Sequence, residues 1–477
     1  MAEKSKSKSS GPYPYLDRYG ANHELPGQGL TKDKVLRQLK EMAEEEDVFW
    51  QTGLCSGTMY GGDPKIFELI GEAFRLYSHV NVLQRDMCPS QTRFEAEIIA
   101  MTLDMLNGHA VKDHDPKHTA CGVVSSGGTE SIIHALLAYR DKFREERNIT
   151  EPEMIMPDTA HPAHEKGAHY FGIKVIKAPV DPQTTQVDVD CVRNHINENT
   201  IALVGTAGNY PYGTIDPIDQ LSELAMKHEI GLHVDGCLGG FILSWGERLG
   251  YDIPVFDFRL PGVTSISADT HKYGYGPKGT SVITFRDKSY RKYQYFAHPE
   301  WKGGLYVSPG IGGSRSGGLL AATWAVMMTL GKEGYMERSK KIFETSYKMQ
   351  EAVKRHPELR LMGTPTFCFS FTSDEFDIYH VNDFMKERGW RFNGQQFPSA
   401  IHMCVTGPQT QPGVVERFDK DLEEAVPYAK KPPEPVPRSG ALYGGQGTRT
   451  MAENVDLNMI REILIAYQDA CLEQPRS

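Results

Sequence analysis

The segment SADTHKYGYGPK, residues 267–278, places Lys272 directly behind His271 at the end of an alternating, strand-like run. The glycines and the proline that follow fit a tight turn in which the backbone can approach a ligand. A lysine held at such a turn is a candidate for a Schiff-base lysine in covalent catalysis. A single lysine is more often an ordinary loop residue, so the neighbouring motifs must decide between the two interpretations.

A second motif, IGLHVDGC at residues 230–237, is an apolar strand that ends in Asp235. In open α/β sheets ligands bind beyond the carboxyl ends of the strands, so we expect Asp235 and Lys272 to face one crevice. Pyridoxal 5'-phosphate requires such a pair. The lysine holds its aldehyde, and the carboxylate keeps the pyridine nitrogen protonated so that the ring can accept electrons.

A third motif, VVSSGGTESIIHALLAY at residues 123–139, predicts a buried strand that breaks at Gly127–Gly128 into an amphipathic helix. Free N–H groups and the dipole at a helix N-terminus favour an anion, so this helix start predicts a cradle for the cofactor phosphate. A plain Ser/Thr N-cap is the alternative when the motif is taken alone. The predicted cradle consists of Ser125, Ser126, Gly127, Gly128 and Thr129.

Together, SSGGTES, HVDGCLGGF and SADTHKYGYGPKG resemble the pyridoxal-phosphate enzymes of fold type I in the group II decarboxylase clan, and within it the sphingosine-1-phosphate lyase family. The similarity covers nearly the whole chain after about residue 40. It includes SGTMYGG at 56–62, AHPAHEKGAHYFG at 160–172 and TAGNYPYGTIDPI at 206–218.

The chain is expected to have an α/β fold of the pyridoxal-phosphate transferase type, because strand-like and helical runs alternate between residues 61 and 330. This pattern predicts a mostly parallel sheet with helices on both faces. Residues 331–477 predict a small α+β domain that closes with a helix from Val455. Residues 1–60 form an N-terminal segment whose first twelve residues are expected to be disordered. The Pro/Gly-rich stretch 428–448 predicts a lid or linker.

The composition indicates which kinds of partner the protein binds and in which cellular compartment it lies. The 477 residues carry a net charge of −10, which argues against nucleic acid. The eight cysteines show no C-x-x-C pair and indicate free thiols in a reducing, cytoplasmic compartment. No signal core is present, and the longest apolar stretch, 319–330, is too short to cross a bilayer. We expect a soluble protein, similar to the bacterial form of the family. The sequence does not show whether the protein is secreted into a host cell.

The resemblance implies roles for individual residues around the cofactor. Lys272 would hold the aldehyde, Asp235 would face the pyridine nitrogen and His161 would stack over the ring. Tyr210 would lie near the substrate hydroxyl, and His271 would reach the phosphate. A turn tyrosine and capping or core histidines are the structural alternatives. The histidines of AHPAH lack further ligands at convincing spacing, so no metal site is expected.

The glycine-rich segment GGSRSGG, 312–318, lacks a full G-x-G-x-x-G pattern and is a poor nucleotide loop. The resemblance implies instead that Gly312 and Ser314 contact the phosphate in the partner's site, which predicts a homodimer with active sites at the subunit interface.

For the substrate phosphate, the resemblance implies Lys278 and Tyr60, with a solvated turn lysine as the alternative for Lys278. The chain departs from the family at Gln84, where many members have a histidine. A neutral amide can still donate to a phosphate, but the contact is weaker than one from a cation.

The resemblance therefore implies retro-aldol cleavage of sphingosine 1-phosphate and other phosphorylated long-chain bases to phosphoethanolamine and a long-chain aldehyde. An amino-acid decarboxylase of the same fold is the nearer alternative, although it would need a cation for the α-carboxylate. A catalytically inactive scaffold is the other, and the intact set Lys272, Asp235 and His161 argues against it.

Overall fold

The computed structural model describes residues 14–57, 59–441 and 457–473, and its centre is a seven-stranded mixed sheet of order β1-β7-β6-β5-β4-β2-β3. Five neighbouring strands, from β3 to β6, run parallel, while β7 pairs antiparallel with both β6 and β1. The strands are β1 (Cys121–Ser125), β2 (Glu153–Pro157), β3 (Lys174–Ala178), β4 (Thr200–Thr206), β5 (Gly231–Asp235), β6 (Ser265–Ala268) and β7 (Ser281–Phe285).

Helices cover both faces of this sheet, and two glycines show how closely they pack. A Cβ on Gly231 of β5 would lie 2.4 Å from the Tyr139 ring, whereas a Cβ on Gly205 of β4 would lie 2.4 Å from Ile218. Gly205 pairs with Val234, so it points to the opposite face from Gly231. The helix that carries Tyr139, α6 (Gly128–Arg147), and the one that carries Ile218, α9 (Ile218–His228), therefore lie on opposite faces.

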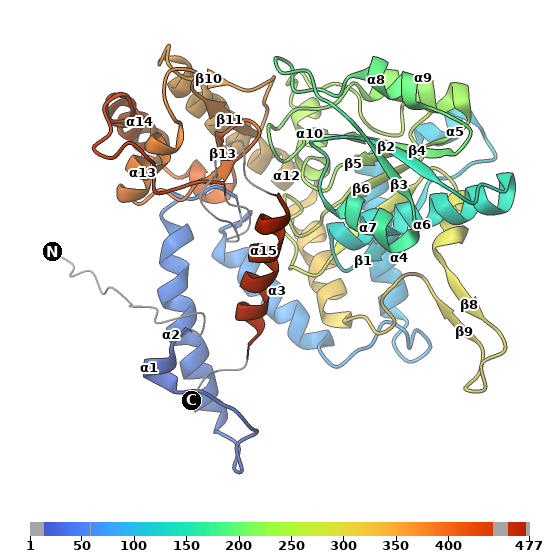
Figure 1. Ribbon diagram of the computed structural model, residues 1–477. Helices are drawn as coiled ribbons and strands as arrows, with labels where there is room; N and C mark the ends of the chain where they lie inside the picture. The colour runs from blue at the N-terminus through green and yellow to red at the C-terminus, as the bar shows by residue number, and fades with distance from the viewer. Residues whose placement is uncertain (1–13, 58, 442–456, 474–477) are drawn as a thin grey trace.

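Further helices surround the large sheet (Figure 1). They are α3 (Pro64–Tyr77), α4 (Ser90–Met105), α5 (Ala110–His114), α7 (Ala163–Phe171), α8 (Val189–His195), α10 (Gly240–Arg248) and α11 (Lys288–Arg291). The short hairpin of β8 (Phe296–His298) and β9 (Tyr306–Ser308) projects from the body at the lower right of Figure 1.

A second, four-stranded antiparallel sheet of order β10-β11-β13-β12 follows the long helix α12 (Gly317–Lys354). Its strands are β10 (Arg360–Leu361), β11 (Cys368–Thr372), β12 (Asn393–Gln395) and β13 (Ala400–Cys404), and its helices are α13 (Tyr379–Glu387) and α14 (Val414–Lys430). The helices α1 (Leu16–Tyr19), α2 (Lys32–Gln51) and α15 (Leu457–Leu472) lie away from the large sheet in Figure 1.

The predicted fold class is confirmed, with two local differences. The predicted lid or linker at 428–448 begins inside α14, which continues through Pro427 to Lys430, and its residues 442–448 lie outside the described residues. The boundary at 330/331 falls within α12, where Gly331 has a left-handed φ of 54° and breaks the helix. The three-part domain division stays a prediction. Among the described residues, no helix is both long and apolar enough to span a membrane.

Candidate active site

A cavity of about 400 Å³ opens at the carboxyl ends of β1, β2, β4, β5 and β6. It combines residues from several strand ends that are far apart in the sequence, as expected for an open α/β sheet. Its lining residues are Tyr60, Gly128, Thr129, Ile132, Thr159, His161, Thr206, Gly208, Asn209, Tyr210, Asp235, Cys237, Leu238, Asp269, His271 and Lys272.

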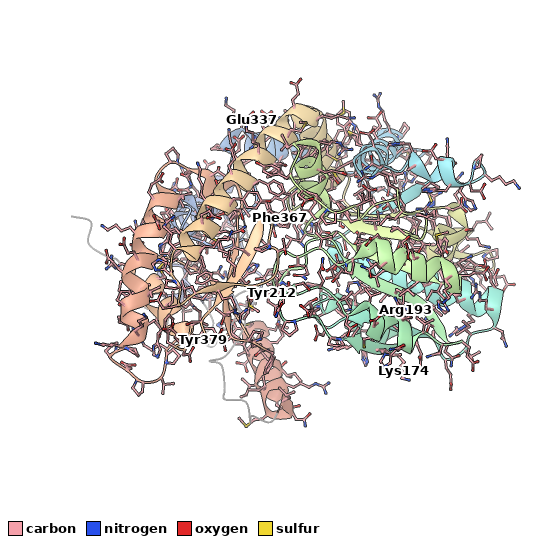
Figure 2. All side chains as sticks on the ribbon, turned by 90° about the horizontal axis from the view of Figure 1, so that it is seen from above. Lys174, Arg193, Tyr212, Glu337, Phe367 and Tyr379 are labelled. Carbon is pink, nitrogen blue, oxygen red and sulfur yellow. The ribbon has the colours of Figure 1, made fainter. Side chains whose placement is uncertain are left out.

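The second sheet packs directly behind the lysine turn. Phe367, just before β11, is fully buried and lies edge-on to the Tyr273 ring, with ring centroids 5.1 Å apart. Tyr273 also donates a hydrogen bond to the carbonyl of Val405 at 2.7 Å. Figure 2 shows Phe367 and Tyr212 at the junction between the two sheets. These contacts fix the residue that follows Lys272, and so restrict where the lysine can reach.

Lys272 forms an ion pair with Asp269 one turn earlier, with Nζ and Oδ2 2.9 Å apart. Burial lowers the pKa of Lys272, but Asp269, together with Tyr60 and Cys237, raises it by more, so the pKa lies well above its usual value. A Cβ on Gly128 would lie 2.6 Å from Asp269 Oδ2, so the carboxylate requires glycine at this position. The lysine is therefore held as a cation against the predicted phosphate cradle.

Asp235 ends β5 and is buried, with 8% of its surface exposed. Its Oδ1 accepts hydrogen bonds from the N–H of Cys237 at 3.0 Å and from the hydroxyl of Ser267 at 3.4 Å. Burial raises its pKa, but three nearby histidines and the Cys237 N–H lower it further, to about 2. Asp235 is thus a carboxylate at any working pH, as a partner for a protonated pyridine nitrogen must be.

His161 lines the cavity, and its Nδ1 accepts a hydrogen bond from the N–H of Ala163 at 3.1 Å. The neutral ring therefore carries its proton on Nε2. Burial lowers the pKa of His161, and the charge of Lys272 acts in the same direction. His164, in contrast, points Nδ1 at the His161 carbonyl, 2.9 Å away, and is fully buried.

The N-terminus of α6 faces the cavity through Gly128 and Thr129. Its N-cap residue is Gly127, which has no side chain to cap the first N–H groups. Ser126 is exposed, and its N–H donates to Glu130 Oε2 at 2.6 Å. Ser126 and Gly127 are not among the residues that line the cavity. Of the predicted cradle, the lining residues are Gly128 and Thr129.

Lys278 lies over the ring of Tyr60, which lines the cavity, with Nζ 4.8 Å from the ring centroid. Its ammonium also donates to the carbonyl of His271 at 3.1 Å. Partial burial of the ammonium, with the charge of Lys272, lowers its pKa to about 8. The predicted phosphate pair Tyr60 and Lys278 is therefore adjacent in space. Gln84 is exposed and does not line this cavity in the described chain.

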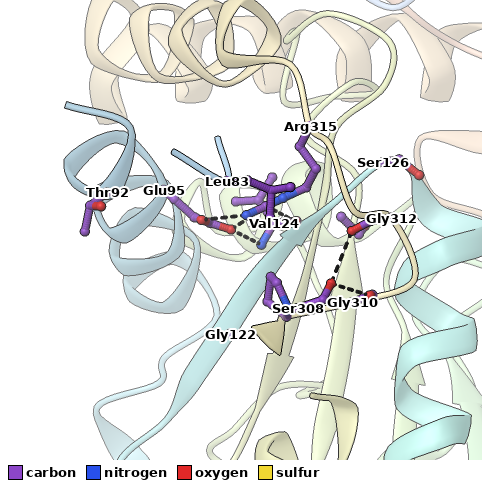
Figure 3. A network of polar contacts seen from close by, with 12 residues as sticks. Leu83, Thr92, Glu95, Gly122, Val124, Ser126, Ser308, Gly310, Gly312 and Arg315 are labelled. Atoms are coloured by element: carbon purple, nitrogen blue, oxygen red, sulfur yellow. Dashed lines mark hydrogen bonds and ion pairs between the residues drawn. The ribbon is translucent and has the colours of Figure 1, made fainter. Parts of the chain in front are cut away.

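The glycine-rich segment 312–318 is anchored by its arginine rather than by a nucleotide (Figure 3). Arg315 binds both carboxylate oxygens of Glu95, at 2.7 and 3.1 Å, and donates to the carbonyl of Val124 at 3.0 Å. Gly312 donates its N–H to Glu130 of its own chain at 3.3 Å, and the Ser314 hydroxyl accepts from Asn81 at 3.0 Å. Neither Gly312 nor Ser314 lines the cavity of its own described chain.

Tyr210 lines the cavity opposite the helix N-terminus, and its ring lies against that of His402, with centroids 4.3 Å apart. Burial lowers the pKa of His402 to about 3, so this partner is neutral. Tyr210 is therefore packed against the second sheet through His402 of β13.

The cavity has the donor set that pyridoxal phosphate requires: a lysine, a buried carboxylate and an uncapped helix N-terminus. Within the described part of the chain, three buried polar atoms of its lining residues also lack any hydrogen-bond partner: Thr159 Oγ1, Asn209 Nδ2 and Asp269 Oδ1. Buried polar groups are rarely left unpaired, so these atoms fit a site for a polar ligand.

Several lining residues were not predicted from the sequence. Asp269, Asn209 and Cys237 stand inside the quoted motifs, close to Lys272, Tyr210 and Asp235, and that proximity was a usable signal. Thr159 gave none, because only the fold brings it to the cavity. The roles of all these residues, and of the predicted ones, stay predictions.

Comparison with known proteins agrees with this geometry. Residues 20–371 match the family model of the pyridoxal-dependent decarboxylase conserved domain. The chain is 44% identical to a sphingosine-1-phosphate lyase of Arabidopsis thaliana, over 94% of this chain and 80% of the relative. A solved structure of a Burkholderia pseudomallei sphingosine-1-phosphate lyase is 56% identical, with a TM-score of 0.91, and the match covers 97% of this chain and 100% of that one.

A Lactobacillus brevis glutamate decarboxylase has the same fold at 20% identity, with a TM-score of 0.71, over 86% of this chain and 95% of that one.

Proposed function

Because the chain belongs to the sphingosine-1-phosphate lyases, within the pyridoxal-dependent decarboxylase family, we propose that it cleaves phosphorylated long-chain bases such as sphingosine 1-phosphate. The products are phosphoethanolamine and a long-chain aldehyde. The enzyme is a pyridoxal-phosphate-dependent lyase of carbon–carbon bonds. The observation that carries the substrate class is the pair Tyr60 and Lys278, which places a cation 4.8 Å over an aromatic ring beside Lys272.

Bound pyridoxal phosphate supplies an aldehyde that binds the substrate amine and a ring that accepts the electrons of the breaking C2–C3 bond. Lys272 would hold the aldehyde before substrate arrives. Asp235, which is ionised, would keep the ring nitrogen protonated, and His161 would pack against the ring. The N–H groups of Gly128 and Thr129 would bind the cofactor phosphate. His271 donates from Nδ1 to the carbonyl of Thr280 at 2.6 Å, so it would assist through Nε2 when that nitrogen is protonated.

Two residues can move the protons of the reaction. The C3 hydroxyl must lose its proton as the C2–C3 bond breaks, and C2 must then gain one. Tyr210 and Lys272 both line the cavity and both can exchange a proton. Lys278 and Tyr60, with Gln84 as a neutral donor, orient the substrate through its phosphate. This contact distinguishes the lyase from a decarboxylase, which would need a cation for a carboxylate on C2.

We also propose a homodimer in which Gly312 and Ser314 reach the phosphate in the partner's site. Since Gly312 already donates to Glu130 of its own chain, Ser314, which is exposed, is the better candidate for this contact. A cytoplasmic location fits the cysteines, because those that the structure describes are all free thiols and most are buried.

The substrate class is tested by comparing kcat/KM for sphingosine 1-phosphate with that for unphosphorylated sphingosine. The intact enzyme should prefer the phosphorylated base by at least about 100-fold, since a charge-assisted contact of roughly 3 kcal/mol is lost without the phosphate. In Lys278→Met the preference should fall to within about 10-fold. Equal rates for the two bases with the intact enzyme would contradict the proposal.

A further inference from the structure

Asp235 stands at one end of a row of buried polar side chains on one face of the large sheet. In the parallel pair of β5 and β6, His233 lies opposite Ser265, and Asp235 lies opposite Ser267. Alternate residues of a strand point to the same face, so these four side chains share it. It is the face on which α6 packs, because the Tyr139 ring occupies the space left open at Gly231.

Hydrogen bonds connect this row from end to end. The Tyr139 hydroxyl lies 2.6 Å from Ser265 Oγ, which lies 2.8 Å from His233 Nδ1. His233 Nε2 lies 3.3 Å from Ser267 Oγ, and Ser267 Oγ lies 3.4 Å from Asp235 Oδ1. Tyr139, His233, Ser265 and Ser267 are all fully buried, so water does not compete for these bonds.

The charge of Asp235 sets the direction of the whole row. An ionised carboxylate can only accept, so Ser267 must give it its single hydroxyl proton. Ser267 can then only accept from His233, which places the imidazole proton on Nε2. His233 Nδ1 is left as an acceptor for Ser265, and Ser265 in turn accepts from Tyr139.

The opposite direction is less favourable for a physical reason. With the proton on Nδ1, His233 would accept from Ser267, and Ser267 would turn a lone pair toward the Asp235 carboxylate. The loss of a hydrogen-bond donor costs more free energy at a buried charged group than at a buried neutral group. Burial, followed by the charge of His164, lowers the pKa of His233 to about 3, so the ring is neutral and has one proton to place.

We infer that His233, as its Nε2–H tautomer, is a positioning residue that acts through Ser267 to hold the Asp235 carboxylate in place for the cofactor ring nitrogen. The inference rests on the proposed role of Asp235 in pyridoxal phosphate binding. His233 does not touch the cavity, since it is not among the lining residues of the described chain. It fixes Asp235 Oδ1 from behind and leaves the other carboxylate oxygen for the cofactor.

The test compares four variants of the full-length holoenzyme. Ser267→Ala removes the donor to Asp235, and His233→Leu removes the donor to Ser267. His233→Gln keeps an amide N–H near the position of Nε2, so it should rescue the effect. Thr284→Val is the matched control, because Thr284 is an equally buried residue whose hydroxyl donates to the carbonyl of Ile266 at 2.8 Å, outside this row.

The measurements are the dissociation constant of pyridoxal phosphate by equilibrium dialysis and the visible absorption band of the bound cofactor. Ser267→Ala and His233→Leu should each raise the dissociation constant about 10-fold and change the ratio of the cofactor's absorption bands. His233→Gln and Thr284→Val should stay within about 3-fold of the intact protein. A merely structural role would lower thermal stability without changing the bands.

The inference is overturned if His233→Leu binds and absorbs as Thr284→Val does, or if His233→Gln is as impaired as His233→Leu. Asp235→Asn, measured in parallel, separates this failure from that of the proposed function. If Asp235→Asn impairs the cofactor site and His233→Leu does not, only the positioning role is wrong. If Asp235→Asn changes neither measurement, the proposed role of Asp235 is itself wrong.

Discussion

At the residue scale, the site depends on charges that are held in place before any ligand binds. Lys272 is paired with Asp269, 2.9 Å away, and Asp235 is kept ionised by donors and by nearby histidines. Lys272 and Asp235 therefore both carry their charges at neutral pH.

The Asp269–Lys272 pair leads to a prediction about cofactor loading. Burial lowers the pKa of Lys272, and Asp269 is the largest of the contributions that raise it above the usual value. In Asp269→Asn the burial effect should dominate, so the neutral amine that attacks the cofactor aldehyde should form at lower pH. We expect the pH profile for the rate of cofactor incorporation to move toward acid, as followed by absorbance. An unchanged profile would show that Asp269 does not control the lysine.

Lys278 gives a prediction about alkaline pH. Its pKa is lowered to about 8, so its charge is complete below that value and is lost as the pH rises through it. The kcat/KM for a phosphorylated base should therefore fall above about pH 8. In Lys278→Arg the guanidinium stays charged, and this fall should move to higher pH. If both proteins lose activity at the same pH, another group causes the fall.

At the element scale, the glycine-rich segment before α12 is attached to the large sheet through one buried carboxylate. Glu95 of α4 has 8% of its side chain exposed and pairs with Arg315, and also with Arg85. Burial raises the pKa of Glu95, but the two arginines lower it further, so it is ionised. This pair joins the end of β1, α4 and the start of α12.

Breaking this pair should be costly. Glu95→Gln leaves the arginine charge buried without its partner, and we expect a loss of roughly 3–5 kcal/mol in the free energy of unfolding. The matched control is Glu351→Gln, which breaks the exposed pair with Lys354 and should cost at most about 1 kcal/mol. Both are measured by chemical denaturation. Equal midpoints for the two variants would contradict the assigned role.

Much of the order of strands and helices could be predicted from the sequence. Apolar runs that end in Asp235 or at Gly127 indicate buried strands whose carboxyl ends lie at the cavity. The prediction failed at Tyr428, where Pro and Gly suggested a linker but α14 continues to Lys430. Tertiary packing of an amphipathic helix outweighed the local signal there. Thr159 could not be predicted, because it reaches the cavity only through the strand order.

At the scale of the whole molecule, the cavity of one chain does not include every residue that the family resemblance assigns to it. Gln84, Gly312 and Ser314 all lie outside the lining residues of the described chain. They are exposed or partly exposed, as residues that serve a second subunit must be in a single chain. The proposed homodimer, in which a second chain completes each site, would account for this distribution.

A shared site can be tested by co-expressing two inactive variants, Lys272→Ala and Ser314→Glu. In a heterodimer one site carries both changes and the other carries none, so activity should recover to about a quarter of the intact enzyme's value. Ser314→Gln, which adds no charge, is the control and should remain largely active. No recovery, from variants shown to form mixed dimers, would place Ser314 outside the partner's site.

The most direct test of the central claim is product analysis by mass spectrometry after incubation of the cofactor-loaded protein with sphingosine 1-phosphate. We predict equal amounts of phosphoethanolamine and the long-chain aldehyde, and neither product from Lys272→Ala. Absence of both products from an intact, cofactor-loaded enzyme, together with carbon dioxide release from amino acids, would contradict the lyase and identify a decarboxylase.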